Sequence, residues 1–453
     1  MFRSLADTLS PLRSRNFRLY LGGQGISMLG NWMQGTAQAW VVWRLTGSTA
    51  ALGIVAMLNT LPILLLGPFS GVWADRLDRR KLLIYTNLLA MILAVVMGSL
   101  VYTDLVRLWH VYIIAGILGC VNALDIPSQQ AFIGDLSGVE FVRKGFTLNS
   151  MMEQVMRMIG PSAAGWMIGG IGEAPAFWLN GLSYVAVIAS LFMVKASQER
   201  QAGASNPLAE FRAGFVFVRR KPRIQDLILF TAMTTLFGFV NTQLFPEIAD
   251  HLLHGGPETL GTMMGAFGAG SFFSALLLTP TLQRVKRTGL ALSGIIAWSG
   301  FWFGAFSLSS SLTFSLVAVF CASFAQPVVL TTVKGLLQVL SPPNMRARVL
   351  SLQVMVAVGI QPLSSLTVGF VAQFAGSTRV IRTNGALMIA AAALLLAVRP
   401  ALRVWVPQEE SGEKAPPASE GDAAASPVTA EPAERLQRDE YARAASETKP
   451  VNS

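Results

Sequence analysis

Long runs of apolar residues follow one another along this chain, with only short polar segments between them. Hydrophobic residues occupy 52% of the 453 positions and charged residues only 13%, about half the charged share of a soluble domain. One globule cannot hide this excess, whereas helices of about 20 residues bury it in a bilayer. The predicted spans are residues 17–43, 50–74, 82–102, 108–133, 147–171, 174–195, 225–247, 258–280, 289–309, 312–337, 348–375 and 378–398. We therefore expect an all-α membrane protein with twelve transmembrane helices, and not a soluble enzyme, a secreted disulfide scaffold or an outer-membrane barrel.

The basic residues lie mainly at one set of span ends. Clusters such as Arg76–Lys81 and Arg219–Arg223 fall on one side of the predicted membrane. The other side carries Arg44, Arg107, Arg379 and Arg382. Because cytoplasmic loops concentrate Lys and Arg, this asymmetry predicts a multi-pass protein with both termini in the cytoplasm. The net charge of +10 therefore reflects topology, and we expect no nucleic-acid binding because no continuous basic face is present.

A long polar stretch after the sixth predicted span divides the chain into two sets of six. We expect an N-terminal six-helix half at 1–195, a cytoplasmic linker at 196–224, a C-terminal six-helix half at 225–398 and a disordered cytoplasmic tail at 399–453. Pro207 and the amphipathic sequence after it predict an interfacial helix in the linker. A constant shift superposes Cys120 on Cys321 and Pro161 on Pro362, which is a weak sign of pseudo-symmetric halves.

A charged motif follows the second predicted span. It reads Gly-Val-Trp-Ala-Asp-Arg-Leu-Asp-Arg-Arg-Lys from Gly71 to Lys81. The glycine permits close helix packing, the aspartate suits a helix N-terminus, and the cations suit carboxylates or helix C-terminal carbonyls. The candidate residues of a conformational latch are Gly71, Asp75, Arg76, Arg79 and Arg80. The alternative is an ordinary positively charged loop.

With this motif the chain resembles the major facilitator superfamily, whose first cytoplasmic loop carries a Gly-x-x-x-Asp-Arg-x-Gly-Arg-Arg signature. Asp78 stands where that family usually has glycine. The stretches Gly30–Gln34, Asp125–Phe132 and Arg157–Pro161 look more specifically like the branch with the enterobactin exporter and macrolide-efflux proteins, the transmembrane secretion effector type. The resemblance implies the major facilitator fold, rocking of two halves, and a proton-driven exporter in the bacterial cytoplasmic (inner) membrane. Tyr112 falls where the superfamily's drug–proton antiporters place an arginine, so proton coupling would use other residues.

Three ionisable residues within the spans are candidates for proton coupling: Asp125, Glu153 and Arg157. Charged side chains at membrane depth are costly and persist mainly for function. We expect Asp125 or Glu153 to take up the proton, because burial favours a neutral carboxyl group, under the control of Arg157. Alternatively, Glu153 and Arg157 form a static pair, and Asp125 sits hydrated near the inner mouth or caps a helix.

Amides recur at alternating spacings of three and four residues in the first span, and polar or aromatic residues follow in the fourth, fifth, seventh, ninth and tenth spans. Polar groups facing lipid would be unsatisfied, so we expect them to line a cavity. The candidate substrate-binding residues are Gln24, Asn31, Trp32, Gln34, Gln38, Asn122, Gln129, Asn149, Asn241, Gln243, Phe245, Trp302 and Gln326. Alternatively, the amides bond helices together and the aromatic rings are ordinary core or interfacial residues.

The sequence thus predicts a secondary active transporter that exports an amphipathic small molecule, siderophore or drug-like, by proton-coupled alternating access. An importer or passive facilitator on the same fold and a membrane sensor or scaffold that does not transport are alternatives. We expect no enzyme activity, cofactor or metal, because nucleophile–base, phosphate-loop and ligand-spacing patterns are absent from the sequence. The expected partners are the lipid bilayer, the substrate and protons, and we expect a monomer.

Overall fold

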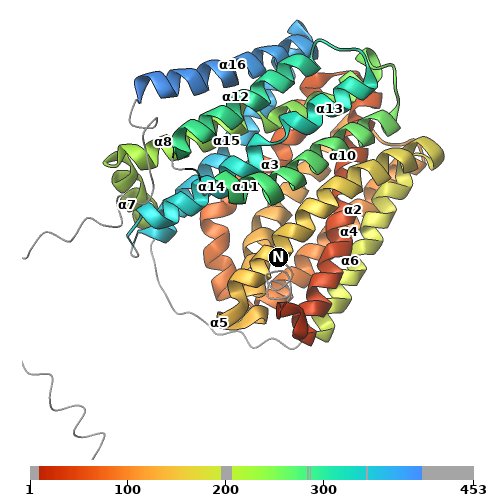
Figure 1. Ribbon diagram of the computed structural model, residues 1–453. Helices are drawn as coiled ribbons and strands as arrows, with labels where there is room; N and C mark the ends of the chain where they lie inside the picture. The colour runs from red at the N-terminus through yellow and green to blue at the C-terminus, as the bar shows by residue number, and fades with distance from the viewer. Residues whose placement is uncertain (1–9, 195–206, 283–284, 286, 343–344, 400–453) are drawn as a thin grey trace, which may run out of the picture. The chain divides into compact units, whose positions relative to one another are not determined.

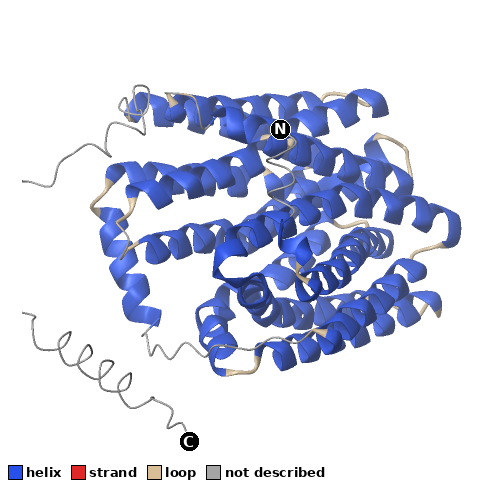
Figure 2. Ribbon diagram, turned by 60° about the horizontal axis from the view of Figure 1, so that its bottom comes forward, coloured by secondary structure: helices blue, strands red, loops and turns tan. Residues whose placement is uncertain are grey.

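The computed structural model describes residues 10–194, 207–282, 285, 287–342 and 345–399. Within these residues every regular element is a helix and no strand occurs (Figure 2). The predicted tail from residue 400 onward and the part of the linker at 195–206 lie outside the described residues.

The helices follow the predicted spans closely, with short turns between them (Figure 1). Before the linker they are η1 (Ser10–Arg13), α2 (Arg15–Thr46), α3 (Thr49–Arg76), α4 (Arg79–Tyr102), α5 (Leu108–Ile171) and α6 (Ala174–Met193). The linker contains α7 (Pro207–Arg219), so the helix predicted to begin at Pro207 is present. The later elements are α8 (Pro222–Phe237), η2 (Phe239–Leu244), α9 (Phe245–Glu247), η3 (Ile248–Leu252), α10 (Pro257–Phe273), η4 (Ser274–Leu278), α11 (Thr279–Leu282), α12 (Thr288–Phe306), α13 (Leu312–Ala322), α14 (Ala325–Leu340), α15 (Arg346–Ala375) and α16 (Ser377–Val398).

Helix α5 joins two predicted spans, 108–133 and 147–171, into one continuous helical segment. The ring of Tyr102, just before α5, contacts the ring of Trp178 at a centroid distance of 5.2 Å. Glu173, just after α5, pairs with Arg44 at the end of α2 at 2.6 Å. Both ends of α5 therefore lie on the same side of the helical set, and the segment reverses direction between two passes.

Ten segments of the described chain are long and apolar enough to cross a membrane. Helix α2 and the second pass of α5 are not among them, because amides and charged residues interrupt their apolar sequence. The all-helical membrane fold is confirmed, whereas the count of twelve spans stays a prediction.

The seventh predicted span, 225–247, is not one regular helix. Gly238 ends α8, the chain tightens into the 3-10 helix η2, and Pro246 lies in α9. Glycine is a weak helix former and proline lacks a backbone donor, so both favour such breaks. The break places Phe239 and Asn241 in η2, where the regular helical spacing assumed from the sequence does not hold.

Buried apolar side chains form separate clusters before and after the linker. Two clusters contain residues from Phe17 to Val194, and the third contains residues from Val218 to Leu395. The two helical sets meet where α5 crosses α10 and α3 crosses α15. Small residues permit these close crossings: a Cβ atom built on Gly165 would lie 2.7 Å from the Cα atom of Gly261.

Hydrogen bonds also join the two sets near the C-terminal end of α2 and the start of α3. The Trp43 indole donates to Asp250 at 2.9 Å, and the Ser48 hydroxyl donates to Gln373 at 2.8 Å. The charge asymmetry predicts that this end faces away from the cytoplasm. With that orientation, these contacts would lie on the outer side of the membrane.

Candidate functional site

Asp125 lies in the first pass of α5 and is 9% exposed. Its Oδ1 atom accepts hydrogen bonds from the Thr86 hydroxyl at 2.6 Å and the Asn87 amide at 3.2 Å, both from α4. Its Oδ2 atom accepts from the Gln129 amide one turn along α5. No ion pair between Asp125 and a cation occurs among the described residues, so neutral donors surround this buried carboxyl group.

Gln129 extends the Asp125 network to the first span. The Gln24 amide of α2 donates to Gln129 at 2.9 Å, so three helices meet around Asp125. The shared helical face predicted for Asp125 and Gln129 is present, but Asn122 from the same predicted face is exposed. The sequence analysis missed Thr86 and Asn87, although two adjacent polar residues inside an apolar span were a usable signal.

Arg157 contacts both helical sets. Its guanidinium carbon lies 4.8 Å from the ring centroid of Trp32 in α2 and 6.0 Å from that of Phe239 in η2. Glu153, one turn earlier, lies 3.6 Å from the nearest Arg157 nitrogen, which is an ion pair without a short hydrogen bond. The two aromatic faces thus supply much of the environment of this cation.

The three predicted coupling residues form two groups. No hydrogen bond or ion pair joins Asp125 to Glu153 or Arg157 within the described residues. Asn149, predicted beside Glu153, has a buried side-chain oxygen with no partner in the described chain, as does Gln154.

Several predicted binding residues of α2 hydrogen-bond to α6. The Asn180 amide of α6 donates to Gln34 at 2.7 Å and to Asn31 at 3.1 Å, and the Tyr184 hydroxyl donates to Asn31 at 2.6 Å. These are the interhelical hydrogen bonds that the alternative interpretation predicts. The assignment of Asn31 and Gln34 to substrate binding therefore stays a prediction. Gln38 is buried, with no such bond seen to another described residue.

A matching amide pair lies in the second set. The Asn384 amide of α16 donates to Asn241 of η2 at 2.7 Å, which parallels the bond from Asn180 to Gln34. In both sets an asparagine of the sixth helix thus bonds to an amide of the first. Sequence analysis included neither Asn180 nor Asn384, because each is an isolated polar residue in an apolar run.

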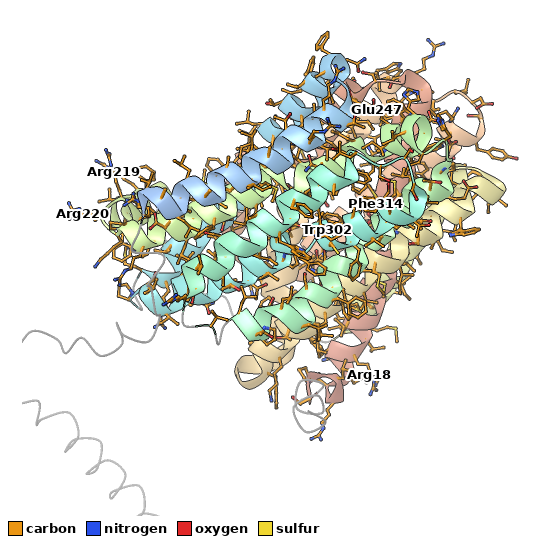
Figure 3. The ribbon with its side chains drawn as sticks, turned by 45° about the horizontal axis from the view of Figure 1, so that its top comes forward. Arg18, Arg219, Arg220, Glu247, Trp302 and Phe314 are labelled. Carbon is orange, nitrogen blue, oxygen red and sulfur yellow. The ribbon has the colours of Figure 1, made fainter. Side chains whose placement is uncertain are left out.

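The remaining candidates in the second set occupy different environments. Gln243 donates to the Ser365 carbonyl at 2.9 Å, and the half-buried Gln326 side chain has a buried oxygen with no partner in the described part. Phe245 is fully buried against Phe267 and Phe306, as a core residue would be. Trp302 packs among aromatic side chains of α12 and α13, among them Phe314 (Figure 3).

The charged loop after α3 is held by contacts inside the first set. Arg79 pairs with Asp135 at 2.8 Å, and Arg80 donates to the Phe192 carbonyl near the end of α6 at 2.8 Å. Asp78, the departure from the family's glycine, has φ of −66° and caps α4 by accepting from the Lys81 amide at 3.1 Å. An ordinary backbone conformation and a favourable cap thus explain why aspartate fits here. The side chains of the other latch candidates, Gly71, Asp75 and Arg76, lie outside the described part.

This arrangement of apolar spans around buried polar groups defines a multi-pass membrane transport protein, and comparison with known proteins identifies its family. The profile of the transmembrane secretion effector family matches residues 6–431, so the chain belongs to that family of major facilitator transporters. The family resemblance predicted from the sequence is thereby confirmed.

Curated relatives are similar at moderate identity. An uncharacterized major facilitator-type transporter of Bacillus subtilis is 26% identical over 57% of this chain, and the match spans 62% of that relative's length. The staphyloferrin A transporter of Staphylococcus aureus is 24% identical over 62% of this chain and 73% of its own length. A multidrug efflux pump of Mycolicibacterium fortuitum is 24% identical over 77% of this chain and 87% of its own length.

Solved structures support the fold. A bacterial homologue of the human lysosomal transporter Spinster superposes with a TM-score of 0.63 at 16% identity, covering 86% of this chain and 96% of its own. The predicted major facilitator fold is therefore confirmed.

Proposed function

We propose that this protein is a proton-coupled exporter of an amphipathic small molecule, working by alternating access in the bacterial cytoplasmic membrane. The efflux-type relatives support transport, and their printed cargoes, a siderophore and multiple drugs, suggest the class of substrate. The observation that carries proton coupling is the buried Asp125 carboxyl group with its three neutral donors.

Protonation of Asp125 would rearrange its hydrogen bonds. An ionised carboxylate only accepts, whereas a protonated one must donate from one oxygen. Either Thr86 or Gln129 would then lose an acceptor. Because Gln129 also accepts from Gln24, the change would reach α2, the first helix of the proposed moving half.

Arg157 would sense the relative position of the two halves. Its stacking on Trp32 and Phe239 requires rings from both helical sets, so separation of the halves would remove one face. The released cation would then strengthen its pair with Glu153 or bind an anionic group of the substrate. We propose that this change of partners at Arg157 links substrate release to the protonation of Asp125 in the first half.

The loop from Gly71 to Lys81 would stabilise the opposite, outward-open arrangement. In the arrangement described here, Arg79 pairs with Asp135 and Arg80 donates to the Phe192 carbonyl, and both of these partners belong to the first set. Closure of the cytoplasmic side would bring this loop toward the second half, where its cations would find new carboxylate or carbonyl partners.

Reconstituted vesicles with an imposed proton gradient test the coupling. Ethidium, a macrolide and a siderophore serve as probes. Gradient-driven accumulation of each probe is compared with its exchange between the inside and the outside of the vesicles at equal probe concentrations. In Asp125→Asn the neutral amide mimics the protonated state, so we expect exchange to continue while gradient-driven accumulation falls by at least tenfold.

Asp104→Asn is the matched control, because Asp104 is exposed in the turn after α4 with a φ of 55°, which asparagine tolerates. It should transport like the unmodified protein. Full gradient-driven accumulation by Asp125→Asn would refute the proposed role of Asp125. Uptake that does not depend on pH would favour the facilitator, and absence of transport of every probe would favour the sensor.

A further inference from the structure

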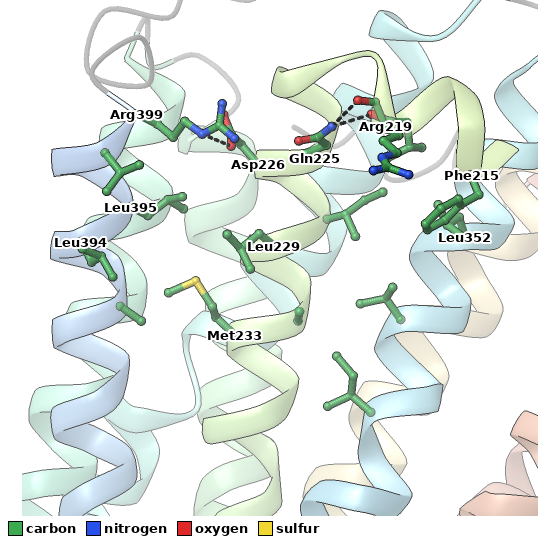
Figure 4. A pocket seen from close by; sticks show the side chains of 17 residues that line it. Phe215, Arg219, Gln225, Asp226, Leu229, Met233, Leu352, Leu394, Leu395 and Arg399 are labelled. Atoms are coloured by element: carbon green, nitrogen blue, oxygen red, sulfur yellow. Dashed lines mark hydrogen bonds and ion pairs between the residues drawn. The ribbon is translucent and has the colours of Figure 1, made fainter.

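A groove of about 870 Å³ opens between α7, α8, α15 and α16 (Figure 4). Its walls are almost entirely apolar and include Leu229 and Met233 of α8, Leu352 of α15, and Leu394 and Leu395 of α16. From Asp226 to Met233 it follows α8 for about 10 Å. The volume, the length along α8 and the apolar lining of the groove therefore suit a segment of a hydrocarbon chain.

Polar side chains gather at one end of the groove, where Figure 4 places Arg219, Gln225, Asp226 and Arg399. Arg399 lies 3.5 Å from the buried Asp226 carboxylate, and this cation offsets part of the negative charge of Asp226. The Arg219 side chain is exposed and makes no hydrogen bond or ion pair with another described residue. Gln225 donates to the Arg219 carbonyl at 2.7 Å, which fixes the end of α7 beside the groove.

More positive charge lies directly next to this end. Arg220 follows Arg219 in the chain, and both side chains project at the same end of the second helical set (Figure 3). Lys221 is exposed as well.

The membrane around the groove and the arginines at its mouth indicate which kind of molecule the groove binds. In a multi-pass membrane protein an apolar channel open between helices meets acyl chains, and an empty one would forfeit its contacts. Guanidinium groups at its mouth match the geometry and charge of a phosphate. Basic pockets between spans on the cytoplasmic side are recognised sites for anionic headgroups.

We propose that this groove binds an anionic phospholipid, with an acyl chain along α8 and α16 and the phosphate held by Arg219 and Arg399. By the predicted orientation, the lipid comes from the cytoplasmic leaflet. The lipid would brace α7 against α8 and α16, so the composition of the membrane would adjust the stability of the second half. This inference does not depend on proton coupling or on the identity of the cargo.

Photocrosslinking in vesicles tests the proposal with the full-length protein. Phosphatidylglycerol or phosphatidylcholine with a diazirine in the acyl chain is added at the same mole fraction, and adducts are mapped by peptide mass spectrometry. We expect adducts around Leu229–Met233 and Leu394–Val398, about fivefold more abundant with phosphatidylglycerol, the advantage of one basic residue near an anionic lipid.

Two variants and a matched control separate headgroup from chain binding. Arg219→Gln should lose the fivefold preference, and Ala391→Phe, which fills the groove, should reduce adducts from both lipids. Arg212→Gln removes the same charge from an exposed position on α7 outside the groove and should change nothing. If Ala391→Phe fails to fold, Arg219→Gln still tests headgroup binding, because Arg219 is exposed and its loss leaves the fold intact.

Several results would overturn the proposal. Equal labelling by the two lipids, or the same preference in Arg219→Gln as in Arg212→Gln, would remove headgroup recognition. Loss of the phosphatidylglycerol preference on adding millimolar inorganic phosphate would indicate a site for free phosphate. Displacement of the lipid by ethidium at its transport concentration would make the groove a substrate path.

Discussion

The crossing of α5 over α10 offers a direct test of which arrangement this structure represents. A Cβ atom on Gly261 would lie 2.6 Å from the Pro161 carbonyl oxygen and 2.7 Å from the Gly165 Cα atom. Both neighbours are backbone atoms, so no rotamer change relieves the overlap. Gly261→Ala must therefore push the two helices apart at the end where the halves meet.

The size of the effect follows from the cost of overpacking, about 1–3 kcal/mol per inserted group in a packed interface. This cost is imposed only while the outer ends are in contact. The ratio of outer-closed to outer-open molecules should therefore fall by about 5-fold to 150-fold, since 1.4 kcal/mol corresponds to a factor of ten.

Spin-label distances measure this population. Labels on cysteines replacing Leu105 and Leu308, both exposed in the turns after α4 and α12, report the separation of the two sets in a background without Cys120 and Cys321. We expect Gly261→Ala to shift the distribution toward longer distances. Gly294→Ala in α12 is the control, because its added Cβ atom meets no atom within 4 Å. An unchanged distribution in Gly261→Ala, or an equal shift in Gly294→Ala, would refute the reasoning.

Three further predictions concern single contacts. Asn384→Leu removes the donor to the buried Asn241 side-chain oxygen and should lower stability by about 1–3 kcal/mol, seen as a lower melting temperature in detergent. Asp78→Ala removes the α4 cap and should cost about 1 kcal/mol in the same assay, while Asp78→Gly should cost only a few tenths; equal losses would argue against capping. Arg157→Lys keeps the charge but loses planar stacking on Trp32, so probe transport should fall several-fold although melting barely changes; unaltered transport would show that the ring contact is incidental.

The candidate site was only partly predictable, and the reasons differ between residues. Asp125 and Gln129 share a face because helical spacing fixes their relation, and the structure places them in one hydrogen-bond network. Thr86 and Asn87 of α4 complete that network; their polar type inside an apolar span is visible in the sequence, but the packing of α4 against α5 decides that they face Asp125. Phe245 is aromatic, as a residue that lines a binding cavity often is. Its burial, however, depends on the rings of Phe267 and Phe306, which come from other helices.

Broken helices account for another part of what sequence analysis missed. The sequence analysis treated residues 225–247 as one regular span, yet Gly238 ends α8 and η2 turns with a different period. Asn241 consequently points to Asn384. Glycine and proline mark where a break is allowed, but packing decides whether the chain breaks there.

Composition and periodicity alone determined that this chain is a helical membrane protein, since only membrane-spanning helices satisfy both its apolar excess and its backbone polar groups. The motif after the second span also sufficed to indicate its family. Only the tertiary structure decided which neighbour each polar side chain meets: Gln34 turns to Asn180, Arg157 lies between Trp32 and Phe239, and Gly165 meets Gly261. The physical reason is that a helix fixes the direction of a side chain relative to its own axis, whereas its partners come from segments far away along the chain.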